Sequence, residues 1–469
     1  MRLSSLINKG LLLAFSSMVF SPAILAQDVT FHKDIEPILQ RACQNCHRPG
    51  GVAPMPLVNY DEVAPFAGLI EYKTGLRDRA GAMPPWYAEK NIGIKQLKND
   101  PSLSEAEIAA ISTWARTGAS KGNEADAPAP LVFDDSIKWS LGVPDLIVNT
   151  EDFFMAKGRP DWWGEIPSVP TGLTEDRYVK SIEVVEVNDV GVGDDASDTV
   201  GGLFIFHHMI WRTEVEDENG KVIPGQSTNW PVHEVGRNGD VFDPDAGPLL
   251  KANSAFYTDS VHMHSNGRDT VGHLQLGFTF HPIGYKPKFK SSISLLGNGV
   301  DISVEGDAKD QEMHAYLVLT EHTKVITFEP HLHAPGARMC LEAIWGYSVE
   351  TLSCVGYDHN WVRGYAFEDD YTPLLPKGTV LHITGYFDNT TANYNVPDAR
   401  NWQGAGNRSV TNMFIDLGIR VTMTDEQFEE EMEKRRTNLA LGPNDHVIGC
   451  PLCLTPFSWP VVESAESGE

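Results

Sequence analysis

Positive charge is scarce in this chain, and so are cysteines and long apolar runs. Lys and Arg total 37 against 64 Asp and Glu, which gives a formal net charge of −27. Because an acidic surface repels phosphate and the basic residues form no cluster, we expect neither nucleic acid nor an anionic membrane surface as a partner. The apolar run at residues 11–20 is too short to cross a bilayer and no later segment qualifies, so we expect no stable membrane span.

Residues 1–26 are typical of a secretory signal peptide. Arg2 and Lys9 give a positive start, and the small residues Ala23 and Ala26 follow the apolar run. We therefore expect a periplasmic or secreted protein, in an oxidising compartment where disulfides persist.

The body of the sequence favours a mainly β fold. Gly (41) and Pro (30) are frequent, and long stretches with helical periodicity are few. From about residue 131, short runs rich in Val, Ile, Phe, Tyr and Thr alternate with Gly, Asn, Asp and Pro, which is typical of antiparallel sandwiches. The clearest runs are residues 180–187, 202–211, 274–280, 313–319, 325–328 and 380–386.

A short motif near the N-terminus predicts covalent haem. Cys43 and Cys46 are followed at once by His47, in the order C-x-x-C-H. Thiols at this spacing can bond the two vinyl groups of one haem c, and the adjacent imidazole can bind its iron. Met83, which precedes two prolines, is the candidate sixth ligand, because thioether sulfur stabilises ferrous iron. Met55 is the rival, and a Met more often fills a core.

Helical patterns flank this motif. Phe31, Ile35 and Leu39 recur at helical spacing before it. A second helix is predicted after Ser104, which forms a capping box with Glu107. Residues 27–122 resemble the small c-type cytochrome domains that are attached to bacterial secreted oxidases. The polar, Pro- and Ala-rich residues 123–130 are typical of a linker.

The other four cysteines form two local pairs. Cys340 and Cys354 bracket a predicted hairpin, and we expect a disulfide between them. Cys450 and Cys453 form a second C-x-x-C, for which we favour a small disulfide over a metal clip. Residues 424–436 predict a charged surface helix that begins with a capping box.

Histidines gather in the β part as three close pairs. The pairs are His207 and His208, His262 and His264, and His331 and His333. In the second and third pairs one residue separates the histidines, so an extended strand turns both rings to one face. The adjacent rings of the first pair need a bulge or a strand end to converge. A single buried His is usually a hydrogen-bonded core residue, but several pairs in one exported, redox-linked chain indicate a metal site.

The order of these motifs resembles the copper type II, ascorbate-dependent monooxygenases, a family that includes peptidylglycine α-hydroxylating and dopamine β-monooxygenases. The shared features are the His-His pair, VHMHSNG at residues 261–267, PHLH at residues 330–333 and a late Met413. Segments such as GYDHNW at residues 356–361 are most similar to bacterial members that carry an N-terminal cytochrome.

This resemblance implies two antiparallel, jelly-roll-like β-sandwich domains after the small helical cytochrome domain. Residues 131–305 would form the first copper domain, residues 306–424 the second, and residues 425–469 a C-terminal helix and tail. The two copper ions of the family face each other across an open cleft between the sandwiches.

The resemblance also implies the ligands of two copper ions. The first set is His207, His208 and His262, and the second, catalytic set is His331, His333 and Met413. Imidazole suits both oxidation states of copper, and a thioether favours Cu(I). His264 remains a rival to His262, which we favour because it matches the first His of the family's segment. The remaining histidines, His359 among them, are expected to be structural or to support the ligands.

The implied function is that of a secreted copper-dependent monooxygenase, which hydroxylates a C–H bond of a small organic substrate with O2. Its electrons would come through the fused haem c domain, with or without an external electron donor. The alternative is a non-catalytic periplasmic protein that binds haem and copper and transfers electrons.

Overall fold

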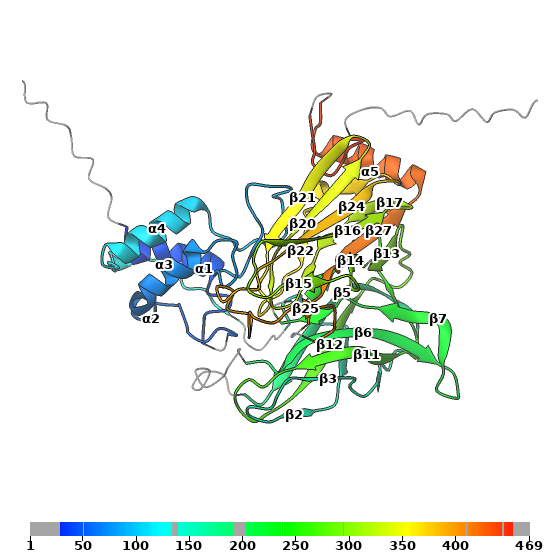
Figure 1. Ribbon diagram of the computed structural model, residues 1–469, viewed down its shortest axis with the longest axis horizontal. Helices are drawn as coiled ribbons and strands as arrows, with labels where there is room; N and C mark the ends of the chain where they lie inside the picture. The colour runs from blue at the N-terminus through cyan, green and yellow to red at the C-terminus, as the bar shows by residue number, and fades with distance from the viewer. Residues whose placement is uncertain are drawn as a thin grey trace, which may run out of the picture.

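The computed structural model describes residues 29–453, apart from residues 50, 134–138, 191–202, 236, 238, 294, 409–410 and 443–444. The signal peptide expected at residues 1–26 lies outside the described residues. A small helical part at the N-terminal end lies beside a large body of antiparallel strands (Figure 1). The expectation of a mainly β, antiparallel fold is therefore confirmed. In the described part of the chain, every helix is too short or too polar to cross a bilayer.

Residues 31–126 supply the helical part. Its elements are η1 (Phe31–Ile35), α1 (Glu36–Ala42), α2 (Tyr60–Val63), η2 (Ala64–Phe66), α3 (Ala67–Gly75), α4 (Glu105–Arg116) and η3 (Glu124–Asp126). As predicted, α4 begins at a capping box, in which Ser104 and Glu107 each accept a hydrogen bond from the other's backbone N–H. The fully buried Phe31, Ile111 and Trp114 form the centre of a core that belongs to this part alone.

An extended segment at residues 86–98 attaches the helical part to the β body. Glu89 N donates a hydrogen bond to Cys354 O at 2.9 Å, so the segment runs along the edge strand β21 (Ser348–Gly356). Its side chains enter the core of the β body at Trp86, Ile94 and Leu97. The two parts therefore share backbone pairing and a hydrophobic core.

The first half of the β body contains two six-stranded sheets. One sheet has the order β1-β12-β5-β10, with β2 on β12 and β9 on β5. Its bounds are β1 (Leu146–Asn149), β2 (Phe153–Met155), β5 (Arg177–Asn188), β9 (Gly239–Val241), β10 (Leu249–Leu250) and β12 (Thr270–Phe280). The other has the order β3-β11-β6-β7, with β4 on β11 and β8 on β6. Its bounds are β3 (Trp162–Gly164), β4 (Val169–Pro170), β6 (Phe206–Glu216), β7 (Val222–Asn229), β8 (His233–Glu234) and β11 (Ala255–Met263).

Large apolar side chains fill the space between these two sheets. On β12, Leu274, Leu276 and Phe278 are fully buried at every second position, which turns all three to one face. Trp211 of β6 meets Phe278 with ring centroids 6.2 Å apart, so the two sheets share one core. This core extends into the second half of the β body, where it includes Val421.

The second half of the β body consists of smaller antiparallel sheets. Their orders are β16-β24-β20-β21, β13-β27-β17-β23, β14-β26-β19, β15-β25 and β18-β22. Their bounds are β13 (Lys290–Ile293), β14 (Leu296–Asn298), β15 (Ser303–Val304), β16 (Gln311–Val318), β17 (His322–Val325), β18 (Thr327–Phe328), β19 (Pro330–Leu332), β20 (Gly336–Trp345), β22 (Tyr365–Ala366), β23 (Leu374–Leu375), β24 (Val380–Phe387), β25 (Gln403–Gly404), β26 (Phe414–Asp416) and β27 (Ile419–Met423), with the short helix η5 (Asp369–Tyr371). Although β13, β14 and β15 precede residue 305, they pair with strands of this half.

The hairpin of β20 and β21 carries the expected disulfide. Trp345 pairs with Ser348, which leaves a two-residue turn in which Gly346 has a φ of 58°. Cys340 and Cys354 lie directly opposite each other in this ladder and form a disulfide, as predicted.

The C-terminal helix α5 (Asp425–Asn438) packs against the β body (Figure 1). It begins at the expected capping box, in which Thr424 accepts a hydrogen bond from Gln427 N. Phe428 and Met432 enter the core of the first half. Beyond the helix, the second C-x-x-C pair forms the small disulfide that the sequence favoured over a metal clip.

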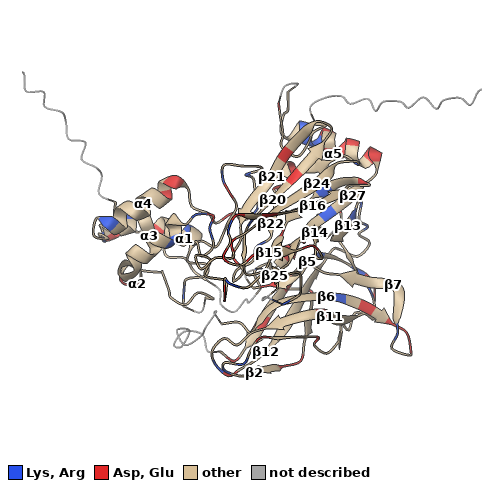
Figure 2. Cartoon of the chain, in the orientation of Figure 1, with Lys and Arg blue, Asp and Glu red and all other residues tan. Residues whose placement is uncertain are grey.

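Acidic side chains mark the first turns of two helices. Glu105 and Glu107 lie at the start of α4, and Asp425 and Glu426 at the start of α5 (Figure 2). Negative charge at this end of a helix interacts favourably with the helix dipole. Part of the acidic excess therefore stabilises local structure.

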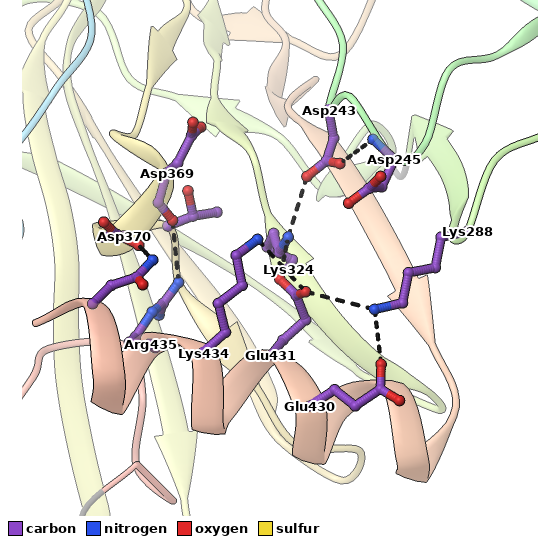
Figure 3. A network of polar contacts seen from close by, with 12 residues as sticks. Asp243, Asp245, Lys288, Lys324, Asp369, Asp370, Glu430, Glu431, Lys434 and Arg435 are labelled. Atoms are coloured by element: carbon purple, nitrogen blue, oxygen red, sulfur yellow. Dashed lines mark hydrogen bonds and ion pairs between the residues drawn. The ribbon is translucent and has the colours of Figure 1, made fainter. Parts of the chain in front are cut away.

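A buried ion network joins α5 to both halves of the β body (Figure 3). Lys324 Nζ lies 3.2 Å from Asp243 Oδ2 and 2.9 Å from Glu431 Oε2, and these three side chains are 9–10% exposed. Lys288 extends the network toward solvent: its Nζ lies 3.9 Å from Glu431 Oε1 and 2.9 Å from Glu430 Oε2. Since Asp243 belongs to the first half, Lys324 to β17 and Glu431 to α5, one ammonium group connects three parts of the chain.

Replacing Lys324 by Met should lower the free energy of unfolding by about 3 kcal/mol, because Asp243 would stay buried without a counter-charge and Glu431 would keep only the more distant Lys288 and Lys434. Urea denaturation measures this loss. The matched control is Lys434→Met, since Lys434 Nζ lies 4.0 Å from Glu431 and its side chain is 60% exposed. The control should lose less than about 0.5 kcal/mol. Equal losses in both variants would contradict the role given to Lys324.

Candidate metal centre

The first predicted ligand set comes together on two neighbouring strands. His207 and His208 lie near the start of β6, and His262 lies near the end of β11, paired with His208. A ligand nitrogen of each ring lies within 4.8 Å of those of the other two. These three rings therefore form a group that could hold a metal ion.

A β-bulge explains how two adjacent histidines can serve one site. His262 pairs with His208, but the next residue of β11, Met263, pairs with Phe206. His207 is therefore the extra residue of β6, and a bulge of this kind re-aims side chains that a regular strand would turn to opposite faces. This bulge lies at the adjacent pair His207 and His208, whose rings need a bulge or a strand end to converge.

Two residues near β3 hold the ring of His262. Trp163 stacks on it with ring centroids 4.5 Å apart and ring planes 3° apart. Asp161 Oδ2 lies 3.0 Å from His262 Nε2, while His262 Nδ1 is buried and has no hydrogen-bond partner among the described residues. The rival His264 lies outside the group of three, although its ring centroid is 5.5 Å from that of His207. The geometry thus favours His262.

The second predicted set lies on β19 and the strand beside it. The ring centroids of His331 and His333 are 5.5 Å apart. β19 pairs antiparallel with β26, with His331 opposite Ile415. His333 follows β19 and Met413 precedes β26, so both lie just beyond the paired residues. The structure therefore brings His331 and His333 together and places Met413 next to the end of the neighbouring strand.

Both rings of this second set are held through Nδ1. His331 Nδ1 lies 2.5 Å from Glu234 Oε1, and His333 Nδ1 donates a hydrogen bond to Thr411 O at 3.1 Å. Such contacts set the orientation of a ring and leave Nε2 for a metal. Sequence reasoning missed Glu234 and Asp161, because a lone carboxylate far from its partner along the chain carries no spacing signal.

The two ligand sets lie close to each other. The ring centroids of His208 and His331 are 6.1 Å apart, and these side chains are buried. Glu234 joins the sets, because it pairs with His208 in the sheet and its carboxylate contacts His331. The two ligand sets therefore approach each other closely at these rings.

Two further rings complete a group that we call the histidine cluster. Its members are His207, His208, His262, His264, His331, His333 and His359. His359 lies in the loop after β21, with its ring centroid 5.1 Å from that of His207 and 6.0 Å from that of His333. From the sequence we expected only a structural or supporting role for His359, and its contacts with rings of both sets were not foreseen.

Burial disfavours the charged form of several rings in the histidine cluster. It lowers the pKa of His207, His208 and His333 well below the ordinary value, and the neighbouring imidazoles lower it further. Burial also lowers the pKa of His359 to about 4. Neutral imidazole is the form that binds metal ions, so these rings are ready to bind at neutral pH.

A buried ion pair holds the two halves of the β body together beside the histidine cluster. Arg237, which follows β8, contacts Glu329, which precedes β19, and their side chains are 7% and 0% exposed. The Tyr357 hydroxyl donates a hydrogen bond to Leu332 O at 2.5 Å. These contacts fix β8, β19 and the loop that carries His359 relative to one another.

The residues of the haem motif lie in the helical part. Cys43 and Cys46 are free and half-buried, and His47 Nδ1 donates a hydrogen bond to Met55 O at 2.9 Å. Met83 is 40% exposed and lines a pocket of about 200 Å³. Cys43, Cys46 and His47 do not line this pocket, so the structure does not bring them together with Met83 there.

The comparisons with known proteins give no family assignment. A scan against protein families finds no match, and a search of curated proteins finds none. Among solved structures, two single-residue variants of oxalate decarboxylase from Bacillus subtilis align with 64% of this chain and 85% of their own, at 7% and 9% identity. Their TM-scores of 0.13 and 0.12 carry no argument about fold or function.

Acidification should destabilise the metal-free protein through its buried histidines. Burial lowers the pKa of His233, which is not a predicted ligand, to about 4. Below about pH 6.5 the unfolded chain therefore takes up a proton that the folded chain refuses, and stability falls by about 1.4 kcal/mol per pH unit for such a group. The pKa of buried Glu186 rises to about 7, which acts in the opposite direction between pH 7 and 4.5.

A difference measurement separates these effects. Between pH 6.5 and 5, the free energy of unfolding of the His233→Gln variant should fall less steeply than that of the wild type, by about 1 kcal/mol per pH unit. Identical slopes for the two proteins would show that His233 is not held uncharged in the folded state.

Proposed function

We propose that this protein is an exported copper-dependent monooxygenase that hydroxylates a C–H bond of a small organic substrate with O2. Electrons would reach the copper ions through a haem c group on residues 27–122. The observation that carries this proposal is the convergence of the five predicted histidine ligands in one group of imidazoles. The resemblance to copper type II monooxygenases supplies the reaction.

The chemistry of the donors fits copper. His207, His208 and His262 present nitrogens within 4.8 Å of one another, and the Nδ1 atoms of His207 and His262 are buried without a hydrogen-bond partner among the described residues. Leaving such atoms unpaired costs free energy, which ligation would recover. Bound copper supplies one-electron redox chemistry and activates O2.

The protein's own groups have separate tasks at the proposed second site. His331, His333 and Met413 would hold the ion. Glu234 orients the ring of His331, and the carbonyl of Thr411 orients that of His333. Burial of the rings keeps bulk water away from the reacting atoms.

The helical part fits a covalent haem. Cys43 and Cys46 are free thiols in a chain whose other four cysteines are paired. The bond from His47 Nδ1 to Met55 O leaves His47 Nε2 for iron. Bound haem supplies a one-electron carrier. The two disulfides support export to an oxidising compartment, periplasmic or extracellular.

The alternative function is a non-catalytic copper and haem protein that transfers electrons. The short distance between His208 and His331 favours it, because ring centroids 6.1 Å apart leave little room between these two rings for a substrate. Oxygen uptake by the copper-loaded protein against a panel of small organic compounds separates the two functions. Uptake that depends on one of these compounds supports the monooxygenase, and copper binding without it supports the alternative.

Replacing His331 by Ala should reduce substrate-dependent oxygen uptake by at least about 100-fold, because the second site loses a ligand together with its contact to Glu234. The visible spectrum of the haem should not change. The matched control is His273→Ala, since His273 lies on β12 and its Nδ1 is 2.8 Å from Asp152. Full turnover in His331→Ala would refute the second-site assignment.

Replacing Met83 by Ala should change the ligation of the haem, because the proposed thioether ligand to iron is lost. The expected signs are an altered visible spectrum and a lower midpoint potential, with thermal unfolding of the β body unaffected. Met55→Ala is the matched comparison for the rival ligand. An unaltered spectrum in Met83→Ala, with a change in Met55→Ala, would transfer the axial role to Met55.

A further inference from the structure

The loop after β21 touches both the helical part and the histidine cluster. Asp358 is 4% exposed, and its Oδ2 accepts hydrogen bonds from Gly81 N at 2.8 Å and from the Tyr394 hydroxyl at 2.7 Å. The Tyr87 hydroxyl also lies within reach of Oδ2, at 3.4 Å. Gly81 and Tyr87 lie on either side of Met83, so one carboxylate holds the segment that carries the proposed haem ligand.

The approach of the helical part to this loop leaves no room for a side chain. A Cβ on Gly356 would lie 1.8 Å from Asp78 O, so glycine is needed where the two backbones meet. Gly356 N also donates a hydrogen bond to Tyr87 O at 2.9 Å. The position of the loop is therefore set by the helical part through its backbone.

His359, the residue directly after Asp358, lies among the rings of both ligand sets. Its ring contacts His207 of the first set and His333 of the second. Its Nδ1 is buried and has no hydrogen-bond partner in the described part of the chain. Buried polar nitrogens in folded proteins are nearly always bonded, so one that faces a group of candidate ligands calls for a partner that the chain does not provide.

We propose that His359 is a further copper ligand in the histidine cluster, and that Asp358 is a positioning residue that ties this ligand to the Gly81 segment of the helical part. The inference rests on the proposed copper binding and extends it. It assigns a ligand outside the two predicted sets, and it makes the geometry of the metal centre depend on the docking of the haem-bearing part.

Copper titration of the full-length, haem-loaded chain tests the ligand role without turnover. Cu(II) salt alone is the probe, followed by bound-metal analysis and by electron paramagnetic resonance. His359→Phe keeps a ring of similar size but removes the nitrogen donors. We expect at least about tenfold weaker binding of one copper ion and loss of one nitrogen coupling from the Cu(II) spectrum. His273→Phe, outside the histidine cluster, should leave both unchanged.

Two outcomes overturn the ligand role. One is an unchanged affinity and spectrum in His359→Phe, and the other is the absence of copper binding by the wild type. His359→Gln provides a second variant if the Phe variant does not fold, which near-ultraviolet circular dichroism monitors. Copper binding with no substrate-dependent oxygen uptake would refute the proposed monooxygenase and leave this inference standing, so the two failures are distinguishable.

The positioning role of Asp358 has its own readout. Asp358→Ala should shift the Cu(II) spectrum and weaken copper binding several-fold, and it should also alter the haem spectrum, because the Gly81 segment loses its acceptor. Asp358→Asn retains one acceptor oxygen and should recover part of both effects. A variant with altered stability but an unchanged Cu(II) spectrum would show that Asp358 is only structural.

Discussion

The arrangement of this molecule depends on packing seven imidazoles close together, most of them in its interior. A protonated ring would be opposed both by burial and by its neighbours, and the pKa of His207, His208 and His333 is lowered for these two reasons. Some ring nitrogens have hydrogen-bond partners in the protein: Nδ1 of His331 contacts Glu234, and Nδ1 of His333 bonds to the carbonyl of Thr411. Others, including Nδ1 of His207, His262 and His359, have no partner among the described residues. A fold that bears this cost in the metal-free state is consistent with a site kept for binding.

The same constraint explains why the two halves of the β body are joined so firmly at this point. Glu234 from the first half contacts His331 from the second, and Arg237 is paired with Glu329 across the same boundary. Removing one partner of either contact would leave the other buried without its counterpart, at a cost of several kcal/mol. The hydrophobic core of the first half also continues into β27 and α5. The close approach of the two ligand sets is thus built into the interface between the halves.

Local features of the fold could be predicted from the sequence, whereas long-range contacts could not. The capping boxes at Ser104 and Thr424 and the disulfide between Cys340 and Cys354 involve residues close together in the chain. The histidine pairs were visible because strand geometry has a period of two. In contrast, Asp161 lies 101 residues before His262, and Glu234 lies 97 residues before His331. Periodicity indicates which face of a strand is buried, but not which distant residue meets it.

The helical part and the histidine cluster are linked through one strand, β21. Residues 86–98 run along its edge, and Glu89 N bonds to Cys354 O within it. Cys354 is tied by its disulfide to β20, which makes this edge a firm support. β21 ends at Gly356, and the loop that follows it carries Asp358 and His359. The helical part therefore docks on the strand whose following loop carries His359 into the cluster, and only a short stretch of backbone separates the docking contacts from this ring.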